Sequence, residues 1–382
     1  MRIAILANEK ASFIQPIAEG LARMLRSCGA EPVLVLDGLE NLALRQSVDF
    51  TSVKSFAGSA ARLSASRRSF DEFVTRLEGV DAIVVVANVP ISFSRSVFPN
   101  IEVLRDRLPN VPIVNYDLHY LPTLDSWARL LLRGEKTKLG ARDLAIFKKG
   151  GFGLERYDWY LMAAAGTELA LPPGPQPFSL IGLDLDDGTL FPGQNGEFRA
   201  LIDFEQNRGD YPGYRAAQLD ALRLAGVNYT VLDGSYSRDE IRAIYRRSSI
   251  YFLASAESFG LPICELQACG AKVFLPNAYW AASHWLGEDL HSERTPALSP
   301  NFVIYEDNAR SLAKRIGEVR DSFDPGEVRG TFKAYQPQLL HGDLIALKAF
   351  LTRLESGEIH SRVHLQHAGI GREPPSRLSI RR

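Results

Sequence analysis

Short continuous apolar runs, separated by segments of helical periodicity, constrain the fold of this chain more than any other feature. In the N-terminal half these runs cover residues 2–7 (RIAILA), 32–36 (PVLVL), 82–86 (AIVVV) and 112–116 (PIVNY). Such runs are typical of strands that are buried on both faces of a parallel sheet. Apolar residues recur at helical spacing from Ile17 to Cys28, and residues 101–108 are also predicted to be helical. This alternation predicts a doubly wound α/β sheet.

The same alternation starts again after residue 198, so a second α/β unit is expected. Strands are predicted at residues 200–204, 228–232, 250–253 and 272–275, and helices at 214–224, 312–319 and 344–354. Ser237 and Glu240 form the S-x-x-E pattern of a capping box, which predicts a further helix start. A chain of 382 residues is longer than one core of ordinary size usually organises, and this favours two domains.

A change of composition marks the expected domain boundary. Residues 169–196 are crowded with Pro, Gly and Asp, which break regular structure, so we place the linker there. The expected parts are domains at 1–172 and 173–336, a helix at 337–357 that crosses back to the N-terminal domain, and a disordered tail at 358–382. Arginines in the tail would allow peripheral membrane contact, although they are too widely spaced to predict an anchor.

Charge and cysteine usage exclude several classes of protein. A formal net charge of -1 gives no reason to expect a nucleic-acid partner. The cysteines, Cys28, Cys264 and Cys269, are too few for a disulfide framework and suit a reducing compartment. The chain start lacks the order of a signal peptide, and no apolar stretch reaches the roughly 18 residues of a membrane span. We therefore expect a cytoplasmic protein.

Residues 250–275 (IYFLASAESFGLPICELQACGAKVFL) are the segment most suited to binding a ligand. A predicted strand ends near Ala254, and Pro262 suits the first turn of the helix that follows. Ligands of open α/β sheets bind beyond the carboxyl ends of the strands, where this loop lies. The free amides of Phe259, Gly260 and Leu261 at the helix start would favour a phosphate.

Two carboxylates, Glu257 and Glu265, flank this loop with the spacing E-x7-E. A carboxylate accepts two hydrogen bonds at once and so suits a vicinal diol of a sugar. Two alternatives stay open: Glu265 could only complement the helix dipole, and Glu257 could be a solvated loop charge. Cys264 and Cys269 are interpreted as core residues, because no histidine accompanies them at metal-ligand spacing.

Residues 254–277 (ASAESFGLPICELQACGAKVFLPN) resemble the donor-binding signature of the retaining glycosyltransferases of the glycosyltransferase-B fold, in particular the large family four. The matching residues are Glu257, Phe259, Gly260, Leu261, Pro262, Glu265, Ala268, Cys269 and Gly270. The resemblance extends over roughly residues 198–320. It implies an α/β fold of two Rossmann-like domains that face each other across a cleft. The N-terminal domain would hold the acceptor and the C-terminal domain the nucleotide-sugar donor.

The resemblance also implies roles for individual residues. Glu265 would hydrogen-bond the ribose hydroxyls, and Glu257 would lie beside the donor sugar as a catalytic residue. The backbone amides of Phe259, Gly260 and Leu261 would contact the sugar and diphosphate. The other residues assigned to donor binding are Ser258, Gly234 and Arg208. A hexosyl transfer with retention is implied, with the nucleotide-sugar as substrate and without a further cofactor. No acidic pair has metal-holding spacing, so we expect no divalent metal.

The chain departs from the family at several points. In residues 201–214 (LIDFEQNRGDYPGY), Arg208 would replace the usual Lys of a Lys-Gly pair, and Arg215 could substitute for the missing Arg. The glycine pair expected after the first strand is absent. In the N-terminal domain His119 is our catalytic candidate, in preference to Asn88 or Asp117, because it follows a predicted strand end.

Several questions remain open at the level of the sequence: the acidic run, the type of activity and the identity of the substrates. The acidic run LDLDDG at residues 183–188 lacks the pattern of a calcium loop and is interpreted as a turn-rich hinge. A nucleotide-sugar epimerase would use the same fold without an acceptor, and a binding protein would keep the donor site without turnover. The acceptor could be a glycan, a lipid-linked sugar or a small molecule, and the base and sugar of the donor are not specified.

Overall fold

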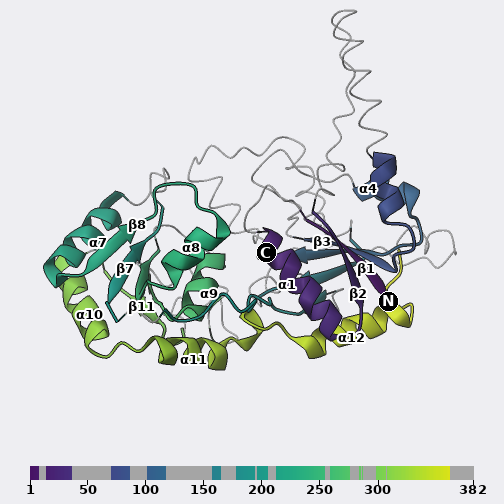
Figure 1. Ribbon diagram of the computed structural model, residues 1–382. Coiled ribbons are helices and arrows are strands. Elements are labelled where there is room, and N and C mark those ends of the chain that lie inside the picture. Colours follow the sequence, from purple (N-terminus) through teal and green to yellow (C-terminus); the bar gives the residue numbers. More distant parts are fainter. Residues whose placement is uncertain are drawn as a thin grey trace, which may run out of the picture. The chain divides into compact units, whose positions relative to one another are not determined.

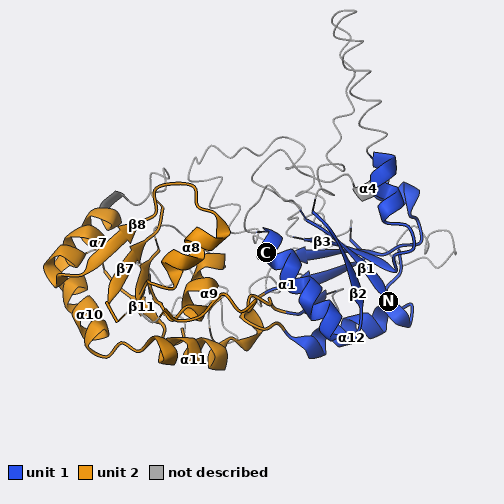
Figure 2. Ribbon diagram, in the orientation of Figure 1, with its two compact units in different colours: residues 1–163, 170–181, 343–382 blue, residues 164–169, 182–342 orange. Residues whose placement is uncertain are grey.

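The computed structural model describes residues 1–7, 14–36, 70–86, 101–117, 157–164, 178–193, 196–204, 212–253, 259–275, 284, 286, 298–306 and 308–361. The chain divides into two compact units, each with its own parallel sheet (Figures 1 and 2). Unit 1 comprises Met1–Ala163, Ala170–Ile181 and Asp343–Arg382, and unit 2 comprises Ala164–Leu169 and Gly182–Gly342. No helix in the described ranges is long and apolar enough to cross a membrane.

The sheet of unit 1 has six strands in the order β2-β1-β3-β4-β5-β6. Its strands are β1 (Arg2–Leu6), β2 (Glu31–Val35), β3 (Ala82–Val86), β4 (Ile113–Asp117), β5 (Trp159–Met162) and β6 (Phe178–Leu180). Ile3 of β1 lies opposite Pro32 of β2 on one side and opposite Ala82 of β3 on the other. Every residue of β3 and of β5 is buried, as expected for a sheet covered on both faces.

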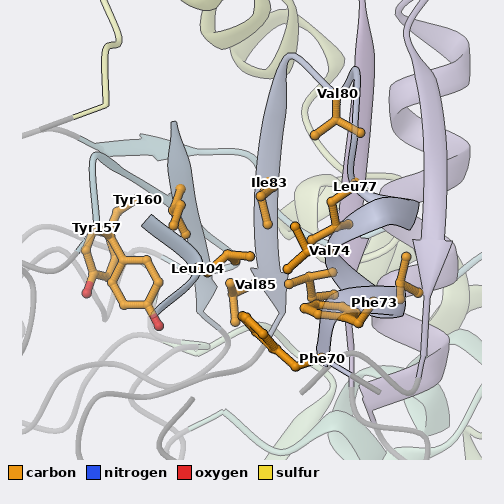
Figure 3. Packing of buried hydrophobic residues seen from close by; sticks show 14 residues of the cluster. Phe70, Phe73, Val74, Leu77, Val80, Ile83, Val85, Leu104, Tyr157 and Tyr160 are labelled. Atoms are coloured by element: carbon orange, nitrogen blue, oxygen red, sulfur yellow. The ribbon is translucent and has the colours of Figure 1, made fainter. Parts of the chain in front are cut away.

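Helices and a compact apolar cluster cover this sheet. The helices include α1 (Ile14–Ser27), α4 (Ile101–Arg107) and α12 (Leu344–Glu355). Phe70, Phe73 and Leu77, on a short helical segment and its end, pack with Ile83 and Val85 of β3 (Figure 3). These side chains are at most 5% exposed, so the cluster contributes to the apolar burial that stabilises unit 1.

The last helix belongs to unit 1 although it comes at the end of the chain. α12 packs against α1 and β6, and the thiol of Cys28 lies 3.8 Å from the main-chain oxygen of Leu344. The sequence predicted that the first domain ends at residue 172. β6 comes after that residue, yet it pairs with β5 of the first sheet. The described chain also continues past residue 358, where a disordered tail was expected. Ile359 is 3% exposed and Ser361 is 1% exposed, so this stretch is packed against the unit.

Unit 2 is built on five strands in the order β11-β10-β9-β7-β8. These are β7 (Arg199–Ile202), β8 (Asn228–Val231), β9 (Ile250–Phe252), β10 (Lys272–Leu275) and β11 (Phe302–Ile304). The rings of Phe252, Phe274 and Tyr305 form an aromatic group in its core. β7, β8, β9 and β10 lie close to where the sequence predicted them. β7, β9 and β10 are largely buried, whereas β8 at the edge of the sheet is partly exposed.

Several helices of unit 2 begin where the sequence supplies a side-chain cap. They are α7 (Pro212–Ala225), α8 (Arg238–Tyr245), α9 (Leu261–Ala268), α10 (Ala309–Asp321) and α11 (Pro325–Tyr335), followed by the 3-10 turn η4 (Pro337–Leu339). The capping box predicted from Ser237 and Glu240 is confirmed at the start of α8. The sequence analysis missed α11, which is capped by Asp324 and has Pro325 in its first turn.

Candidate functional site

The strand order of unit 2 identifies one edge as the natural place for a ligand. Its first strand, β7, has β8 on one side and β9 on the other. The connections from β7 to α7 and from β9 to α9 therefore leave the sheet in opposite directions from neighbouring strand ends. In open α/β sheets, ligands bind in the crevice beyond the carboxyl ends of the strands at such a switch point. The loop predicted to bind the donor follows β9 at this edge.

Gly260 opens α9 at this edge, as the sequence predicted. Its φ of 62° lies in the left-handed region that glycine adopts without strain, and no side chain caps the helix. Pro262 lies in the first turn, where a missing amide hydrogen costs nothing. In the described part of the chain, the amide of Leu261 has no hydrogen-bond acceptor. The helix start can therefore receive an anionic oxygen.

A buried histidine holds the residue that precedes Gly260. The ring of His284 stacks on the ring of Phe259, and His284 Nε2 lies 2.6 Å from the main-chain oxygen of Phe259. His284 Nδ1 lies 3.1 Å from the side-chain oxygen Oε1 of Gln336. Burial lowers the pKa of His284 more than these two hydrogen bonds raise it, so the ring is neutral. A neutral ring carries a single N–H, and the shorter of the two contacts is the one in which Nε2–H donates to the main-chain oxygen of Phe259.

Glu265 lies on α9 and is held by an arginine of α8. The Nη2 atom of Arg242 donates to Oε1 of Glu265 across 3.0 Å, and both side chains are buried. The neighbouring positions of α8 and α9 in unit 2 are visible in Figure 1. Burial raises the pKa of Glu265, and the charge and hydrogen bond of Arg242 oppose this rise. Glu265 is therefore an oriented carboxylate rather than a solvated helix-start charge.

Arg242 in turn contacts two residues of the acidic segment. Its Nη1 atom lies 2.5 Å from Oδ2 of Asp187 and 2.5 Å from Oγ1 of Thr189. Arg238 also donates to Asp187, across 2.6 Å. Burial alone would raise the pKa of Asp187, but the hydrogen bonds from Arg242 and Thr189 outweigh it and hold the pKa well below its usual range. Asp187 is thus an ionised partner for Arg242 at neutral pH.

The acidic run at residues 183–188, interpreted from the sequence as a turn-rich hinge, follows the boundary between the two units and makes these contacts within unit 2. Asp186 forms a second ion pair, with Arg329 of α11, across 3.0 Å. Gly182 has a φ of 68°, and a Cβ there would lie 2.0 Å from the main-chain oxygen of Gln338. The segment is therefore pinned to unit 2 through its carboxylates and its close backbone packing.

Two further predicted residues lie at the carboxyl edge of the sheet. Arg215 of α7 donates from Nη2 to the main-chain oxygen of Asp203, at the end of β7, across 2.5 Å. Gly234 follows β8, and a Cβ there would meet no atom within 4 Å. Arg215 thus adjoins the switch point between β7 and β9, whereas Gly234 follows the outer strand of the sheet.

Several predicted residues lie outside the described ranges. These are Glu257, Ser258, Arg208, His119 and the alternative Asn88. For Asp117 only the backbone, at the end of β4, is described. Of the residues predicted to bind a donor, Phe259, Gly260, Leu261 and Glu265 lie together at the start of α9 and along it.

The sequence analysis missed Arg242, Asp187, Thr189 and His284. A signal existed for Arg242, because it lies three residues before Tyr245 on the buried face of an amphipathic helix. An arginine on such a face needs an acidic partner. The other three residues have no local signal, since their partners are remote in sequence.

The comparisons with known proteins agree with this architecture. The chain is similar to an alpha-glucosyltransferase (AGT) in complex with UDP, with a TM-score of 0.52 and 13% identity over 93% of this chain and 100% of that chain. It is also similar to a UDP-forming trehalose-phosphate synthase from Burkholderia xenovorans (TM-score 0.49, 10% identity, 93% and 98% covered). A UDP-GlcNAc 2-epimerase from Neisseria meningitidis is a third similar structure (TM-score 0.48, 8% identity, 94% and 100% covered).

The similarity to the alpha-glucosyltransferase shows the fold of the chain. It is a glycosyltransferase-B fold, with two parallel α/β sheets in separate units, which confirms the fold class expected from the sequence. No family model matches the chain, and no curated protein matches it in sequence.

Proposed function

We propose that this chain is a retaining, metal-independent glycosyltransferase that takes a hexosyl group from a nucleoside diphosphate sugar. The observation that carries the proposal is the pair formed by Gly260 and Glu265. An uncapped helix start with a left-handed glycine and an oriented carboxylate lie on one short helix, at the carboxyl edge of a parallel sheet. The sequence pattern around them resembles the donor-binding signature of family four, and this supports the same assignment.

Three residues of the candidate site that the structure describes, Leu261, Arg215 and Glu265, have a role in this proposal. The amide of Leu261 and the positive end of α9 stabilise the negative charge that develops on the diphosphate as the sugar–phosphate bond breaks. Arg215, beside the end of β7, adds a positive charge to this edge. Glu265 accepts hydrogen bonds from the ribose hydroxyls.

The remaining roles rest on the family resemblance. Glu257 and Ser258 contact the donor sugar, Arg208 faces the diphosphate, and His119 acts from the N-terminal domain, which receives the acceptor. The cysteines Cys28, Cys264 and Cys269 are unpaired thiols, which supports the cytoplasmic location that belongs to this proposal.

A thermal-shift screen without metal tests the proposal. UDP, GDP, ADP, CDP and their common sugars are added to the wild type, to Glu265→Ala and to Glu318→Ala. Glu318 is an exposed carboxylate on α10 of the same unit and serves as the matched control. A ligand at about 100 times its Kd stabilises the fold by roughly 2.7 kcal/mol. We expect one base to stabilise the wild type and Glu318→Ala but not Glu265→Ala. If no nucleotide stabilises the wild type at millimolar concentration, the proposal is wrong.

Product analysis then separates transfer from epimerisation. A transferase releases the nucleoside diphosphate, either with an acceptor or by slow hydrolysis of the donor. An epimerase returns a nucleotide-sugar with a changed sugar. A protein that binds the donor and does neither would be a binding protein.

A further inference from the structure

We infer that Asp187, Thr189 and Arg242 are positioning residues that orient Glu265 so that the site selects a ribonucleotide over its 2′-deoxy counterpart. This inference rests on the proposed function, because it assigns a specificity to the same donor site. It adds residues from a different segment, 184–190, to that site. None of the three is needed to touch the nucleotide.

The first step concerns the two oxygens of Glu265. Arg242 Nη2 donates a hydrogen bond to Oε1. The other oxygen, Oε2, accepts no hydrogen bond from any residue that the structure describes. Only 9% of the Glu265 side chain is exposed, so a ligand has a narrow approach to the carboxylate. The direction from which a hydroxyl can donate is therefore set by how Arg242 holds the carboxylate plane.

The second step concerns what holds Arg242. A guanidinium group is planar, so fixing one of its nitrogens fixes the direction in which the other points. Nη1 is fixed by Asp187 and by Thr189 Oγ1, each 2.5 Å away. Thr189 Oγ1 donates to Asp187 Oδ1 across 2.7 Å, which closes a ring of three hydrogen-bonded side chains. This ring determines where Nη2 meets Glu265.

The charges of this cluster balance. Arg238 and Arg242 face Asp187 and Glu265, which gives two positive and two negative groups. A guanidinium group is too basic to lose its proton even when it is buried, so without Asp187 the side chain of Arg242 would keep its charge but lose the anchor on Nη1. It would then be free to turn toward Glu265, and the carboxylate would turn with it. A site built to bind a hydroxyl rejects an analogue that lacks it, and this rejection weakens when the acceptor is no longer aimed.

The experiment compares affinities for paired ligands. Isothermal titration measures the Kd of UDP, GDP, ADP and CDP and of their 2′-deoxy forms for the wild type, Asp187→Asn, Thr189→Val and Asp186→Asn. Asp186→Asn is the matched control, because the neighbouring carboxylate pairs with Arg329 and not with Arg242. We expect the wild type and Asp186→Asn to prefer the ribonucleotide by about tenfold. We expect Asp187→Asn and Thr189→Val to lose most of this preference.

The ratio of the two affinities separates positioning from general stability. If a residue had only a structural role, its substitution would weaken the binding of both nucleotides equally and leave the ratio of their Kd values unchanged. Thr189→Val keeps nearly the same shape, so it decides the question even if Asp187→Asn does not fold. An unchanged ratio in Thr189→Val overturns the inference while the proposed function stands. A wild type that binds none of the nucleotides overturns the proposed function, and the inference with it.

Discussion

His284 Nε2 lies 2.6 Å from the main-chain oxygen of Phe259, inside the core of unit 2. Phe259 immediately precedes the glycine that opens α9, so this contact fixes the backbone at the start of the proposed donor site. Gln336 holds the other ring nitrogen and lies at the C-terminal end of α11. One ring thus ties the start of α9 to the end of α11.

Replacing His284 tests whether this contact supports the site. His284→Leu leaves the oxygen of Phe259 buried without a donor, which should cost about 1–3 kcal/mol of unfolding free energy. His284→Gln can still donate to that oxygen and should lose less. Urea denaturation measures both variants. Equal losses in the two variants would show that packing around the ring matters and the hydrogen bond does not.

The lowered pKa of His284 predicts a pH dependence of stability. The folded protein holds the ring neutral, whereas the unfolded chain protonates it below about pH 6.5. The unfolded state therefore binds more protons, and stability falls as the pH decreases from about 6.5 toward the folded pKa. The contribution of this group is fully present above about pH 6.5. Thermal unfolding between pH 7.5 and 5 should show a shallower decline for His284→Gln than for the wild type. Parallel curves for the two proteins would contradict this prediction.

Gly260→Ala should affect both stability and nucleotide binding. A φ of 62° disfavours a side chain by about 1–2 kcal/mol, so either the fold loses that much or the helix start changes its shape. Gly317→Ala is the control, because Gly317 lies inside α10 and a Cβ there meets no atom within 4 Å. That substitution should raise stability by up to about 1 kcal/mol and leave nucleotide binding unchanged. Unfolding and nucleotide titration check both variants.

Two glycines with left-handed backbones separate conformational strain from crowding. Gly226 has a φ of 61° and open space around its missing side chain. Gly270 has a φ of 89°, and a Cβ there would lie 2.7 Å from the main-chain oxygen of Pro325 at the start of α11. Gly226→Ala should lose about 1–2 kcal/mol. Gly270→Ala should lose about 1–3 kcal/mol more, because α11 has to move away. Similar denaturation midpoints for the two variants would mean that α11 moves without a loss of unfolding free energy.

The strands that could be predicted are those whose apolar runs are long or flanked by clear breaks. The runs at 82–86 and 272–275 match β3 and β10, because burial on both faces demands continuous apolar residues. β5 was missed although its four residues, WYLM, are all apolar, and β6 was missed because it lies in the Pro- and Gly-rich stretch that was interpreted as the linker. α11 was missed because only Val328 and Phe332 mark its buried face.

The local part of the candidate site could be predicted, whereas its support could not. Gly260 and Leu261 could be predicted as a helix start, because a helix start is recognised from residues that are adjacent in the sequence. The partner of Glu265 is 23 positions away, and Asp187 lies 55 positions from Arg242. Such distant pairings depend on how α8, α9 and the acidic segment pack. An acidic run rich in turn residues gives no sign that its carboxylates meet arginines.

The position of α12 has a consequence for how the chain is made. α12 is the last described helix, yet it packs against α1 and β6, so unit 1 needs both ends of the sequence. The residues of unit 2 between them form a nearly unbroken stretch, Gly182–Gly342. Translation proceeds at roughly 5–20 residues per second, so the first sheet waits about ten seconds or more for its last helix. Unit 2 can complete its core during that time, and the half of the protein that is synthesised first is therefore the half that finishes folding last.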